Sequence, residues 1–325
     1  MPTDPLFSQA GGEIISQTAS GPDNLSWHDM HVHLIDGTYE LFRHYFAVPS
    51  SVDTAGNPIG AVRGVVGSIA GMLEGGATHV GVATDHVIES FRNRMYAGYK
   101  TGEGVDPELM AQFGPLESAL DALGVTLWPM IEEEADDGLA SAARLAGADP
   151  RVERVWICTP DKDLAQSVVG DRIVQFDRRQ QLVRDADRVR EKFGVGPESI
   201  PDLLALTGDS ADGFPGLPGW GQKSAATVLA SYEHLEHIPE DDSEWNVRVR
   251  GAARLAATLV DRREEALLYR TLATLRDGIR LFDSVDELQW KGPRPEFQAL
   301  AASMNAMGLW NRVVELWESN QTEAG

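Results

Sequence analysis

Residues 208–229 read GDSADGFPGLPGWGQKSAATVL and join two carboxylates to a glycine-proline hairpin and the start of a helix. Carboxylates repel phosphate, whereas a glycine hairpin that leads into a helix N-terminus attracts it. The whole chain is acidic, with a formal net charge of −22. Carboxylates that surround metal ions count as negative in the sequence but not in the working site. The acidic composition therefore does not exclude nucleic acid as a partner.

Upstream of this segment, four apolar runs have the length and composition of strands, and helical patterns separate them. The predicted strands are 30–36, 78–85, 124–130 and 151–161, and the predicted helices are 60–75, 107–123 and 135–147. This alternation predicts an α/β fold with a parallel sheet and right-handed crossovers. From about residue 185 the strand signals largely stop. The predicted helices there are 186–193, 198–206, 222–232, 248–260, 262–275 and 295–318.

Length and composition bound the organisation of the chain. Its 325 residues, 42% of them hydrophobic, suffice for one large or two modest domains. The single cysteine, Cys158, excludes an internal disulfide framework, and no apolar run approaches the ~20 residues needed to cross a membrane. A cytoplasmic protein without a membrane partner is the expectation. The expected parts are a disordered tail at 1–28, an α/β core at 29–185, a helical region at 186–312 and a C-terminal end at 313–325 that frays from about Glu318.

Acidic residues stand at the ends of the predicted strands. The first strand ends in Asp36, the second in Asp85 and the fourth in Asp161, with Asp163 two residues on. The run EEEADD after the third strand adds Glu134, Asp136 and Asp137. In open parallel sheets the site lies at the carboxyl ends of the strands, so these side chains are expected to converge. Such a cluster needs a cation, and its hard oxygen ligands suit two magnesium or manganese ions of the kind that hydrolyse phosphodiesters.

Each acidic motif alone has an ordinary structural explanation. A lone aspartate at a strand end is usually a turn former or a helix N-cap. The run 132–137 is typical of a solvated helix start that the helix dipole favours. The pair in TPDKD could form a capping turn. Only the joint placement of these motifs favours a metal site.

Together the motifs resemble the 5′-nuclease family of flap endonucleases, stand-alone bacterial 5′–3′ exonucleases and the 5′-nuclease domain of bacterial DNA polymerase I. The resemblance covers roughly 30–232 and continues more weakly to about 312. It rests on HLIDGTYELFRHYFA, GVATDHVIESFRNRMYAGYK, EEEADDGLAS, CTPDKDLAQSV and ALTGDSADGFPGLPGWGQKSAATVL. It implies a PIN-like parallel-sheet nuclease core and a helical half with a helix–three-turn–helix motif that binds DNA.

The resemblance also implies the metal ligands and the products. All of the family's carboxylates have a counterpart here. Those implied nearest the first ion are Asp36, Asp85, Glu134, Asp136 and Asp161. Asp163, Asp209 and Asp212 are implied at the second ion, with Asp137 between the two. At least two magnesium or manganese ions then support a hydrolysis that leaves a 5′-phosphate and a 3′-hydroxyl.

A locally basic segment, ESFRNRMYAGYK (89–100), resembles the part of the family that forms a helical arch over the site. The resemblance implies that Lys100 and Arg92 touch the scissile phosphate and stabilise its developing charge. It places Tyr99 where an aromatic ring can stack on an unpaired base. The alternative is an ordinary amphipathic surface helix with a buried tyrosine.

The hairpin GLPGWG (216–221) fits a pattern found in DNA-binding hairpins. Gly216, Gly219 and Gly221 let the backbone approach a phosphate, and Lys223 in the first turn of the next helix adds an ionic contact. The alternative is a tight loop whose glycines serve only its turn. Gly213 departs from the family pattern, in which asparagine is common.

Several residues could suggest a functional site but are better predicted to have structural roles. His31 and His33 alternate along the first strand and are expected to pack. Trp220 is expected to anchor the hairpin, and Cys158 to be a small core residue. His86, directly after the second strand, is a weaker candidate for the metal site.

The sequence therefore predicts a metal-dependent 5′ exonuclease and flap endonuclease of DNA repair or replication. The expected substrates are DNAs with a 5′ flap, a nick or a free 5′ end, and the expected state is a monomer. No polymerase segment follows the nuclease motifs, so the expectation is a stand-alone enzyme. Two alternatives stay open: a nuclease of RNA 5′ ends or RNA–DNA hybrids, and a branched-DNA-binding protein that has lost catalysis.

Overall fold

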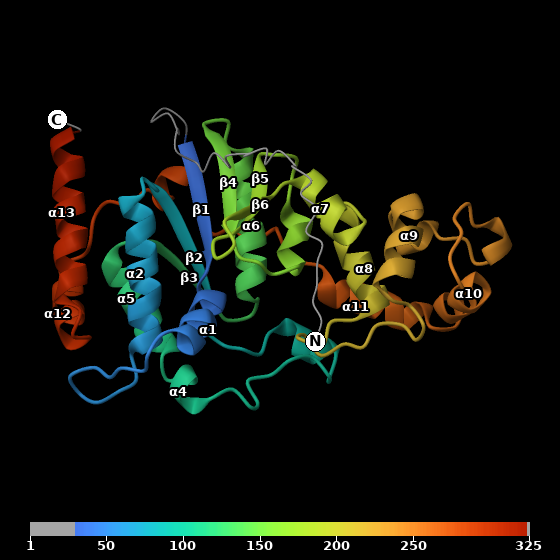
Figure 1. Cartoon of the computed structure of the whole chain (residues 1–325), viewed down its shortest axis with the longest axis horizontal. Coiled ribbons are helices and arrows are strands. Elements are labelled where there is room, and N and C mark those ends of the chain that lie inside the picture. The colour runs from blue at the N-terminus through green and yellow to red at the C-terminus, as the bar shows by residue number, and fades with distance from the viewer. Residues whose placement is uncertain (1–29, 324–325) are drawn as a thin grey trace, which may run out of the picture.

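Six strands form one sheet in the order β3-β2-β1-β4-β5-β6 in the computed structural model, which describes residues 30–323 (Figure 1). The strands are β1 Met30–Asp36, β2 His79–Asp85, β3 Thr126–Met130, β4 Val152–Cys158, β5 Ile173–Asp177 and β6 Leu182–Arg184. The first five are parallel, and β6 is antiparallel to β5. The α/β fold with a mostly parallel sheet is thus confirmed. The tail predicted at 1–28 lies outside the described residues.

The four predicted strands are confirmed within a few residues, but β5 and β6 were missed. β5 has five residues and includes Gln175 and Asp177, and β6 has three residues. Neither is a continuous apolar run, so neither gives a clear strand pattern. β5 is a strand because it pairs with β4, in the register Val155 with Ile173. Their pairing depends on tertiary contacts that local sequence does not report.

Helices cover both faces of the sheet and build the second half of the chain. The α-helices of the first half are α1 Gly37–Ala47, α2 Gly60–Glu74, α3 Phe91–Met95, α4 Pro107–Met110, α5 Phe113–Leu123 and α6 Ala135–Ala148. Those of the second half are α7 Ala186–Phe193, α8 Ile200–Thr207, α9 Gln222–Tyr232, α10 Ala252–Asp261, α11 Arg263–Ala273, α12 Glu296–Ser303 and α13 Met307–Glu323. Short 3₁₀ helices connect them, namely η1 Asp163–Ser167, η2 Pro197–Ser199, η3 Leu235–His237, η4 Asp242–Glu244 and η5 Val285–Leu288. Among residues 30–323, no helix has both the length and the apolar character needed to span a bilayer.

Two predicted helices are each divided in the structure. The helix predicted at 107–123 is α4 and α5, and the break places the Gln112 side chain where it accepts a 3.0 Å hydrogen bond from the first turn of α2. The helix predicted at 295–318 is α12 and α13, because Asn305 adopts a left-handed conformation with φ 55° that ends α12. α13 continues to Glu323, past Glu318, from which fraying was expected.

Each face of the sheet packs on its own apolar cluster. Along β1, Leu34 packs toward α6 and Ile35 packs toward α2 and α5, and both side chains are fully buried. Cys158 is buried in the same cluster as Ile35, as predicted. Figure 1 shows helices on both sides of the strands. Because both faces are covered, the carboxyl ends of the strands are the edge on which a site can form.

The helical half has an apolar cluster of its own, built from α7 to α11 at the right of Figure 1. The rings of Phe214 and Tyr269 stack in it, with 5.6 Å between their centroids. Tyr99 belongs to the same cluster although it precedes α4 in the chain. The segment between α3 and α4 therefore joins the sheet to the helical half.

Gly81 in β2 has no room for a side chain, because the ring of Trp128 packs against it. A Cβ atom there would lie 2.3 Å from the ring of Trp128. We expect Gly81→Ala to lower the free energy of unfolding by about 1–3 kcal/mol through overpacking. Gly71→Ala in α2 is the matched control, because its Cβ meets nothing within 4 Å, and it should raise the free energy of unfolding by about 0.5–1 kcal/mol. Urea denaturation measures both, and effects of the same sign would contradict the packing argument.

Candidate active site

The carboxyl ends of three parallel strands carry the first acidic side chains of the site. Asp36 ends β1, Asp85 ends β2, and Asp161 follows β4. One oxygen of Asp36 accepts from the Tyr39 amide at 2.8 Å, and the other accepts from the Thr159 hydroxyl at 3.0 Å. Asp85 accepts a 2.8 Å hydrogen bond from the first amide of α6. The capping roles considered from the sequence are thus present, and they fix the positions of these carboxylates.

Crowding of the carboxylates perturbs their titration. Burial raises the pKa of Asp36 to about 7, and the charges of Asp85 and Asp161 add to that effect. Burial, followed by the charges of Asp161 and Asp36, raises the pKa of Asp136 well above its ordinary range. Burial and then the charge of Asp161 raise the pKa of Asp163 in the same way. A cation among these groups would favour their charged forms.

Three carboxylates approach one another closely enough to hold one metal ion. Asp163 begins η1, while Asp209 and Asp212 follow α8, and one oxygen from each lies within 4.8 Å of the other two. All three side chains are buried. The Oδ1 atom of Asp163 accepts no hydrogen bond from any described residue, which is unusual for a buried oxygen. This set of hard oxygen donors fits magnesium or manganese.

Two lysines partly compensate the carboxylates. The Lys100 amine lies 2.7 Å from Glu134 Oε2 and 2.9 Å from Asp212 Oδ1. The Lys162 amine lies 2.6 Å from Asp209 Oδ2. Their side chains are 32% and 38% exposed, so both lysines are partly accessible from solvent. Lys162 was not among the predicted site residues, although its place inside the Asp-Lys-Asp motif was a usable signal.

Arg92 is buried in the protein, and its predicted contact with the scissile phosphate is corrected. Its side chain is 1% exposed. The guanidinium donates to both oxygens of Asp137 at 2.7 and 2.8 Å and to Glu134 at 3.0 Å. Its remaining donors reach the carbonyl oxygens of Leu272 and Thr274. All the donors of the guanidinium are used inside the protein, so none is left for a phosphate.

The predicted roles of Asp137 and Tyr99 are also corrected, because both side chains are used for contacts inside the protein. Besides Arg92, Asp137 binds the amides of Glu134 and Arg276 at 3.0 and 2.8 Å. These hydrogen bonds occupy the oxygens that a position between two metal ions would require. Tyr99 is 3% exposed, and its hydroxyl donates to Glu134 at 3.2 Å. Its ring therefore packs inside the protein, as the alternative foresaw, and does not face an unpaired base.

The segment that resembles an arch is largely irregular, since α3 has only five residues. The Ser90 hydroxyl donates to Glu134 at 2.7 Å, and the Asn93 side chain donates to the Lys100 carbonyl at 2.8 Å. The Lys100 amide donates to the Asp212 carbonyl at 2.9 Å. The segment is thus fixed against the carboxylates at both ends, and Lys100 is presented to them.

His31, His33 and His86 contact residues outside the carboxylate group. The rings of His31 and His33 stack beside Trp156, so their expected packing role is confirmed. The His86 ring lies 2.7 Å from an oxygen of Glu117 in α5. His86 therefore supports a neighbouring glutamate and is not part of the group that could hold a metal.

Two glycines of the hairpin segment are required by close backbone approach. Gly213 has φ 87°, and a Cβ atom there would lie 2.2 Å from the carbonyl oxygen of Gly98. The asparagine of the family pattern has no room in this arrangement. Gly216 is buried with φ 68°, and its Cβ would lie 2.3 Å from the amide nitrogen of Gly208. The predicted phosphate contact of Gly216 is therefore corrected, because this glycine closes the hairpin.

The other predicted contacts of the hairpin are accessible. Gly219, Gly221 and Lys223 are exposed where α9 begins. Trp220 lies between the two glycines but is 6% exposed, and its indole donates to the carbonyl oxygen of Leu255 at 3.2 Å. Trp220 is thus the predicted packing anchor, and it holds the exposed backbone in place.

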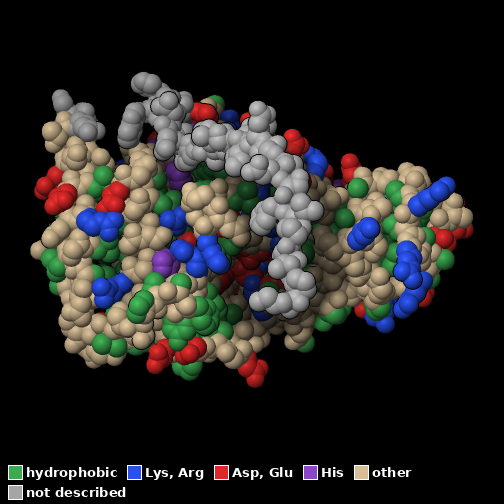
Figure 2. Space-filling view, in the orientation of Figure 1, with side chains coloured by type: hydrophobic (Ala, Val, Ile, Leu, Met, Phe, Trp, Pro, Cys, Tyr) green, Lys and Arg blue, Asp and Glu red, His purple; other side chains and the backbone are tan. Residues whose placement is uncertain are grey.

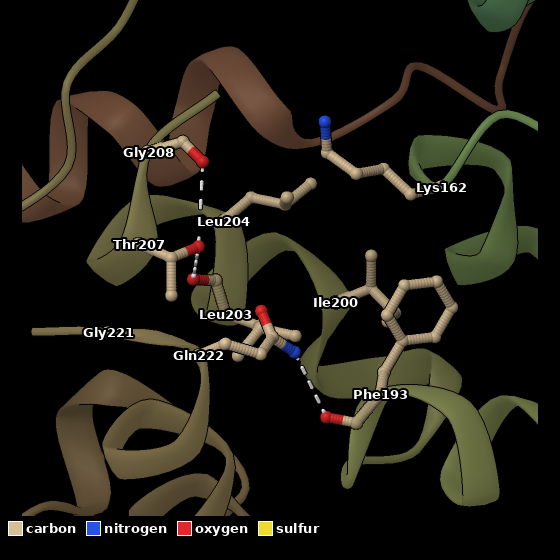
Figure 3. A pocket seen from close by; sticks show the side chains of 9 residues that line it. All are labelled: Lys162, Phe193, Ile200, Leu203, Leu204, Thr207, Gly208, Gly221 and Gln222. Atoms are coloured by element: carbon tan, nitrogen blue, oxygen red, sulfur yellow. Dashed lines mark hydrogen bonds between the residues drawn. The ribbon is translucent and has the colours of Figure 1, made fainter. Parts of the chain in front are cut away.

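A cavity of about 320 Å³ lies beside the hairpin, between α7, α8 and the start of α9 (Figure 3). Its polar wall groups are already bonded to the backbone: the Thr207 hydroxyl within α8, and the Gln222 amide to the Phe193 carbonyl at 3.2 Å. Lys162 borders the cavity, but its amine pairs with Asp209. The cavity therefore offers no converging set of free polar groups. Its lining residues are Lys162, Phe193, Ile200, Leu203, Leu204, Thr207, Gly208, Gly221 and Gln222.

Two family models match the chain in succession. Residues 31–194 match the model described as 5′-3′ exonuclease, N-terminal resolvase-like domain. Residues 195–296 match the model described as 5′-3′ exonuclease, C-terminal SAM fold. Together the matches cover the sheet, the candidate metal ligands and the hairpin.

Similar proteins and structures agree with these matches. DNA polymerase I of Pseudomonas aeruginosa is 36% identical over 293 residues, which are 87% of this chain and 31% of that protein. The chain thus spans about a third of that relative. A 5′-3′ exonuclease of Buchnera aphidicola subsp. Schizaphis graminum is 28% identical over 262 residues, 79% of this chain and 90% of that protein. T5 5′-exonuclease with bound zinc has a TM-score of 0.62 at 20% identity, covering 79% of this chain and 95% of that one. The catalytic core of Rad2 in complex with DNA substrate has a TM-score of 0.57 at 16% identity, covering 89% of this chain and 93% of that one.

The buried ion pair of Arg92 is expected to stabilise the site strongly. Arg92→Met leaves Asp137 and Glu134 without their buried cation, so the free energy of unfolding should fall by about 3–5 kcal/mol. Arg94→Met is the matched control, because its pair with Glu132 is exposed at both ends, 67% and 64%, and should cost about 0–1 kcal/mol. Urea denaturation compares the two variants. Equal costs would show that Arg92 is not the structural clamp described above.

Proposed function

The chain belongs to the 5′–3′ exonuclease family, and we propose that it is a metal-dependent nuclease that cuts DNA at 5′ ends and 5′ flaps. Its substrates are DNAs with a 5′ flap, a nick or a free 5′ end in repair or replication, and its products carry a 5′-phosphate and a 3′-hydroxyl. One observation carries the proposal: oxygens of Asp163, Asp209 and Asp212 lie within 4.8 Å of one another, and one buried oxygen of Asp163 is unsatisfied. The zinc ions in T5 5′-exonuclease and the DNA in the Rad2 complex give further support, although they concern those proteins.

We propose that the carboxylates share two divalent ions, magnesium or manganese. Asp163, Asp209 and Asp212 hold one of them. The ligands of the other come from the strand-end set, Asp36, Asp85, Glu134, Asp136 and Asp161. When bound, such ions lower the pKa of water and stabilise the charge of the leaving oxygen. Asp137 takes no part in this assignment, because its oxygens bind Arg92 and backbone amides.

Lys100 is the group of this chain that acts on the phosphate in our proposal. Its amine lies between Glu134 and Asp212, and its side chain is partly exposed. Burial alone would lower the pKa of Lys100, but the charges of Asp212 and Glu134 raise it well above its ordinary range. Lys100 is therefore positively charged throughout the neutral range. In that position it stabilises the negative charge that develops on the phosphate in the transition state.

The helical half holds the duplex in our proposal, and the sheet holds the ions. The exposed backbone at Gly219 and Gly221 lets a phosphate approach, and Lys223 adds a direct ionic contact. Asp209 and Asp212 belong to the same segment as this hairpin. The distance between the duplex contact and the cut is therefore set by one rigid segment. Contacts to phosphate carry no base code, so cleavage is independent of sequence.

Loss of the divalent ions or of one ligand is expected to abolish cleavage. Asp163→Asn should slow single-turnover cleavage of a 5′-flap DNA by several powers of ten, because the metal chemistry has no substitute. Without metal the variant should be at least as stable as the parent, since it lacks one repelling buried charge. Its melting temperature should rise less than that of the parent when magnesium is added, because only the other ion keeps its ligands. Asp241→Asn, in the exposed loop before η4, is the control, and full cleavage in excess EDTA would overturn the proposed function.

Lys100→Ala is expected to slow cleavage by about 10²–10³-fold, as loss of a charge-stabilising donor does. Flap affinity in EDTA should change much less, because the lysine acts mainly in the transition state. Single-turnover rates and binding curves on the same DNA decide. Lys100→Arg keeps the charge and should recover part of the rate. If Lys100→Ala reduced binding as much as the rate, the lysine would be only a phosphate contact.

A further inference from the structure

One surface of the helical half is basic although the chain is acidic. The stretch 245–260 contains three arginines, Arg248, Arg250 and Arg254, and no aspartate or glutamate. All three side chains are exposed. Figure 2 shows Lys and Arg side chains gathered on the lobe at the right, where Figure 1 places α9 and α10. Arg248, Arg250 and Arg254 are called the basic surface below.

The arginines of the basic surface form no ion pair with any residue in the described part of the chain, 30–323. Other arginines nearby differ in this respect, since Arg262 pairs with Glu265 and Arg270 pairs with Glu236. An unpaired guanidinium offers a planar set of N–H donors that matches the oxygens of a phosphate. The basic surface therefore carries uncompensated positive charge in a geometry suited to phosphate.

Packing of the chain before α10 turns the arginines outward. Val247 and Val249 are partly buried against the apolar cluster of the helical half, whereas Arg248 and Arg250, which alternate with them, are exposed. The alternation leaves guanidinium groups on the outside with no apolar centre between them. Stable protein interfaces have such an apolar centre, so the surface is better suited to a charged polymer than to a folded protein.

The basic surface adjoins the hairpin at Arg254. A Cβ atom on Gly219 would lie 3.9 Å from Arg254 Nε, so this arginine lies beside the exposed backbone of the hairpin. The Trp220 indole donates to the Leu255 carbonyl and packs on the ring of Trp245, with 6.2 Å between centroids. These buried contacts fix the basic surface and the hairpin relative to each other.

We propose that Arg248, Arg250 and Arg254 form a second contact with the phosphate backbone of duplex DNA, next to the hairpin contact. The inference rests on the proposed function and deepens it by adding residues that hold the substrate. Duplex DNA carries about one negative charge per 1.7 Å of axis, so unpaired arginines beside a bound phosphate can meet further phosphates. This contact is independent of base sequence. It adds to the attraction that Lys223 supplies in a chain of net charge −22.

The test is the salt dependence of binding to an uncut 5′-flap DNA, measured by fluorescence anisotropy in EDTA. Arg254→Ala should lower the magnitude of the slope of log K against log salt by about one, and the double variant Arg248→Ala/Arg250→Ala by about two. Lys291→Ala is the control. Lys291 is exposed beside Trp290, whose amide binds Thr78 at the start of β2, the end of the sheet opposite the carboxylates. The salt slope of Lys291→Ala should equal that of the parent.

The outcomes separate this inference from the proposed function. A steep slope for the parent that the arginine variants leave unchanged overturns the second contact and leaves the nuclease proposal intact. A parent that does not bind the flap DNA overturns both. Variants that lose affinity for an RNA duplex of the same sequence but not for DNA overturn the assignment to DNA. Equal losses on several duplex sequences, unchanged melting temperatures and recovery in Arg248→Lys/Arg250→Lys support it.

Discussion

Repulsion among buried carboxylates is the constraint on which the rest of the structure depends. Asp36 and Asp163 are each almost fully buried, and each faces other carboxylates. An uncompensated buried charge costs several kcal/mol, so the fold must bring cations to them. Lys100 and Lys162 provide part of that compensation from two different segments. One buried oxygen of Asp163 accepts no hydrogen bond, so the described residues leave the compensation incomplete there.

This compensation determines how the segments meet. Arg92 joins α6, through Asp137, to the carbonyl oxygens at the end of α11. Lys100 joins the same segment to the hairpin through Asp212, and Gly213 permits the close approach of the two backbones. The sheet, the segment between α3 and α4 and the helical half therefore form one charge-compensated unit. A rigid unit of this kind can hold a phosphodiester and its catalytic groups in a fixed relation.

The sequence reveals features that are local and fails where burial depends on distant partners. The carboxylates at the ends of β1, β2 and β4 could be predicted, because strand patterns and the topology of parallel sheets place them at one edge. The roles of Arg92 and Tyr99 could not be predicted, because their closeness to Lys100 in the sequence does not say which side chains point inward. Their orientation depends on contacts with Glu134 and Asp137, which lie far away in the sequence. The hairpin glycines share one motif, yet only some are exposed, because closure of the turn is a property of the packed backbone.

An acidic chain can present basic surfaces to a polyanion because charge acts locally. The Debye length is about 8–10 Å at physiological ionic strength, so exposed charges further apart than this are largely screened from each other. Part of the negative charge lies in the site, where lysines, and in our proposal metal ions, compensate it. Arg248, Arg250 and Arg254 are exposed and unpaired, so they present positive charge at the surface near the hairpin. Net charge sums all charged residues regardless of their position. It is therefore a poor guide to binding partners when some charges are buried with their counter-charges and others are exposed. In this protein the positions of the charges, with carboxylates in the site and unpaired arginines on the surface, indicate a polyanionic partner that the net charge does not.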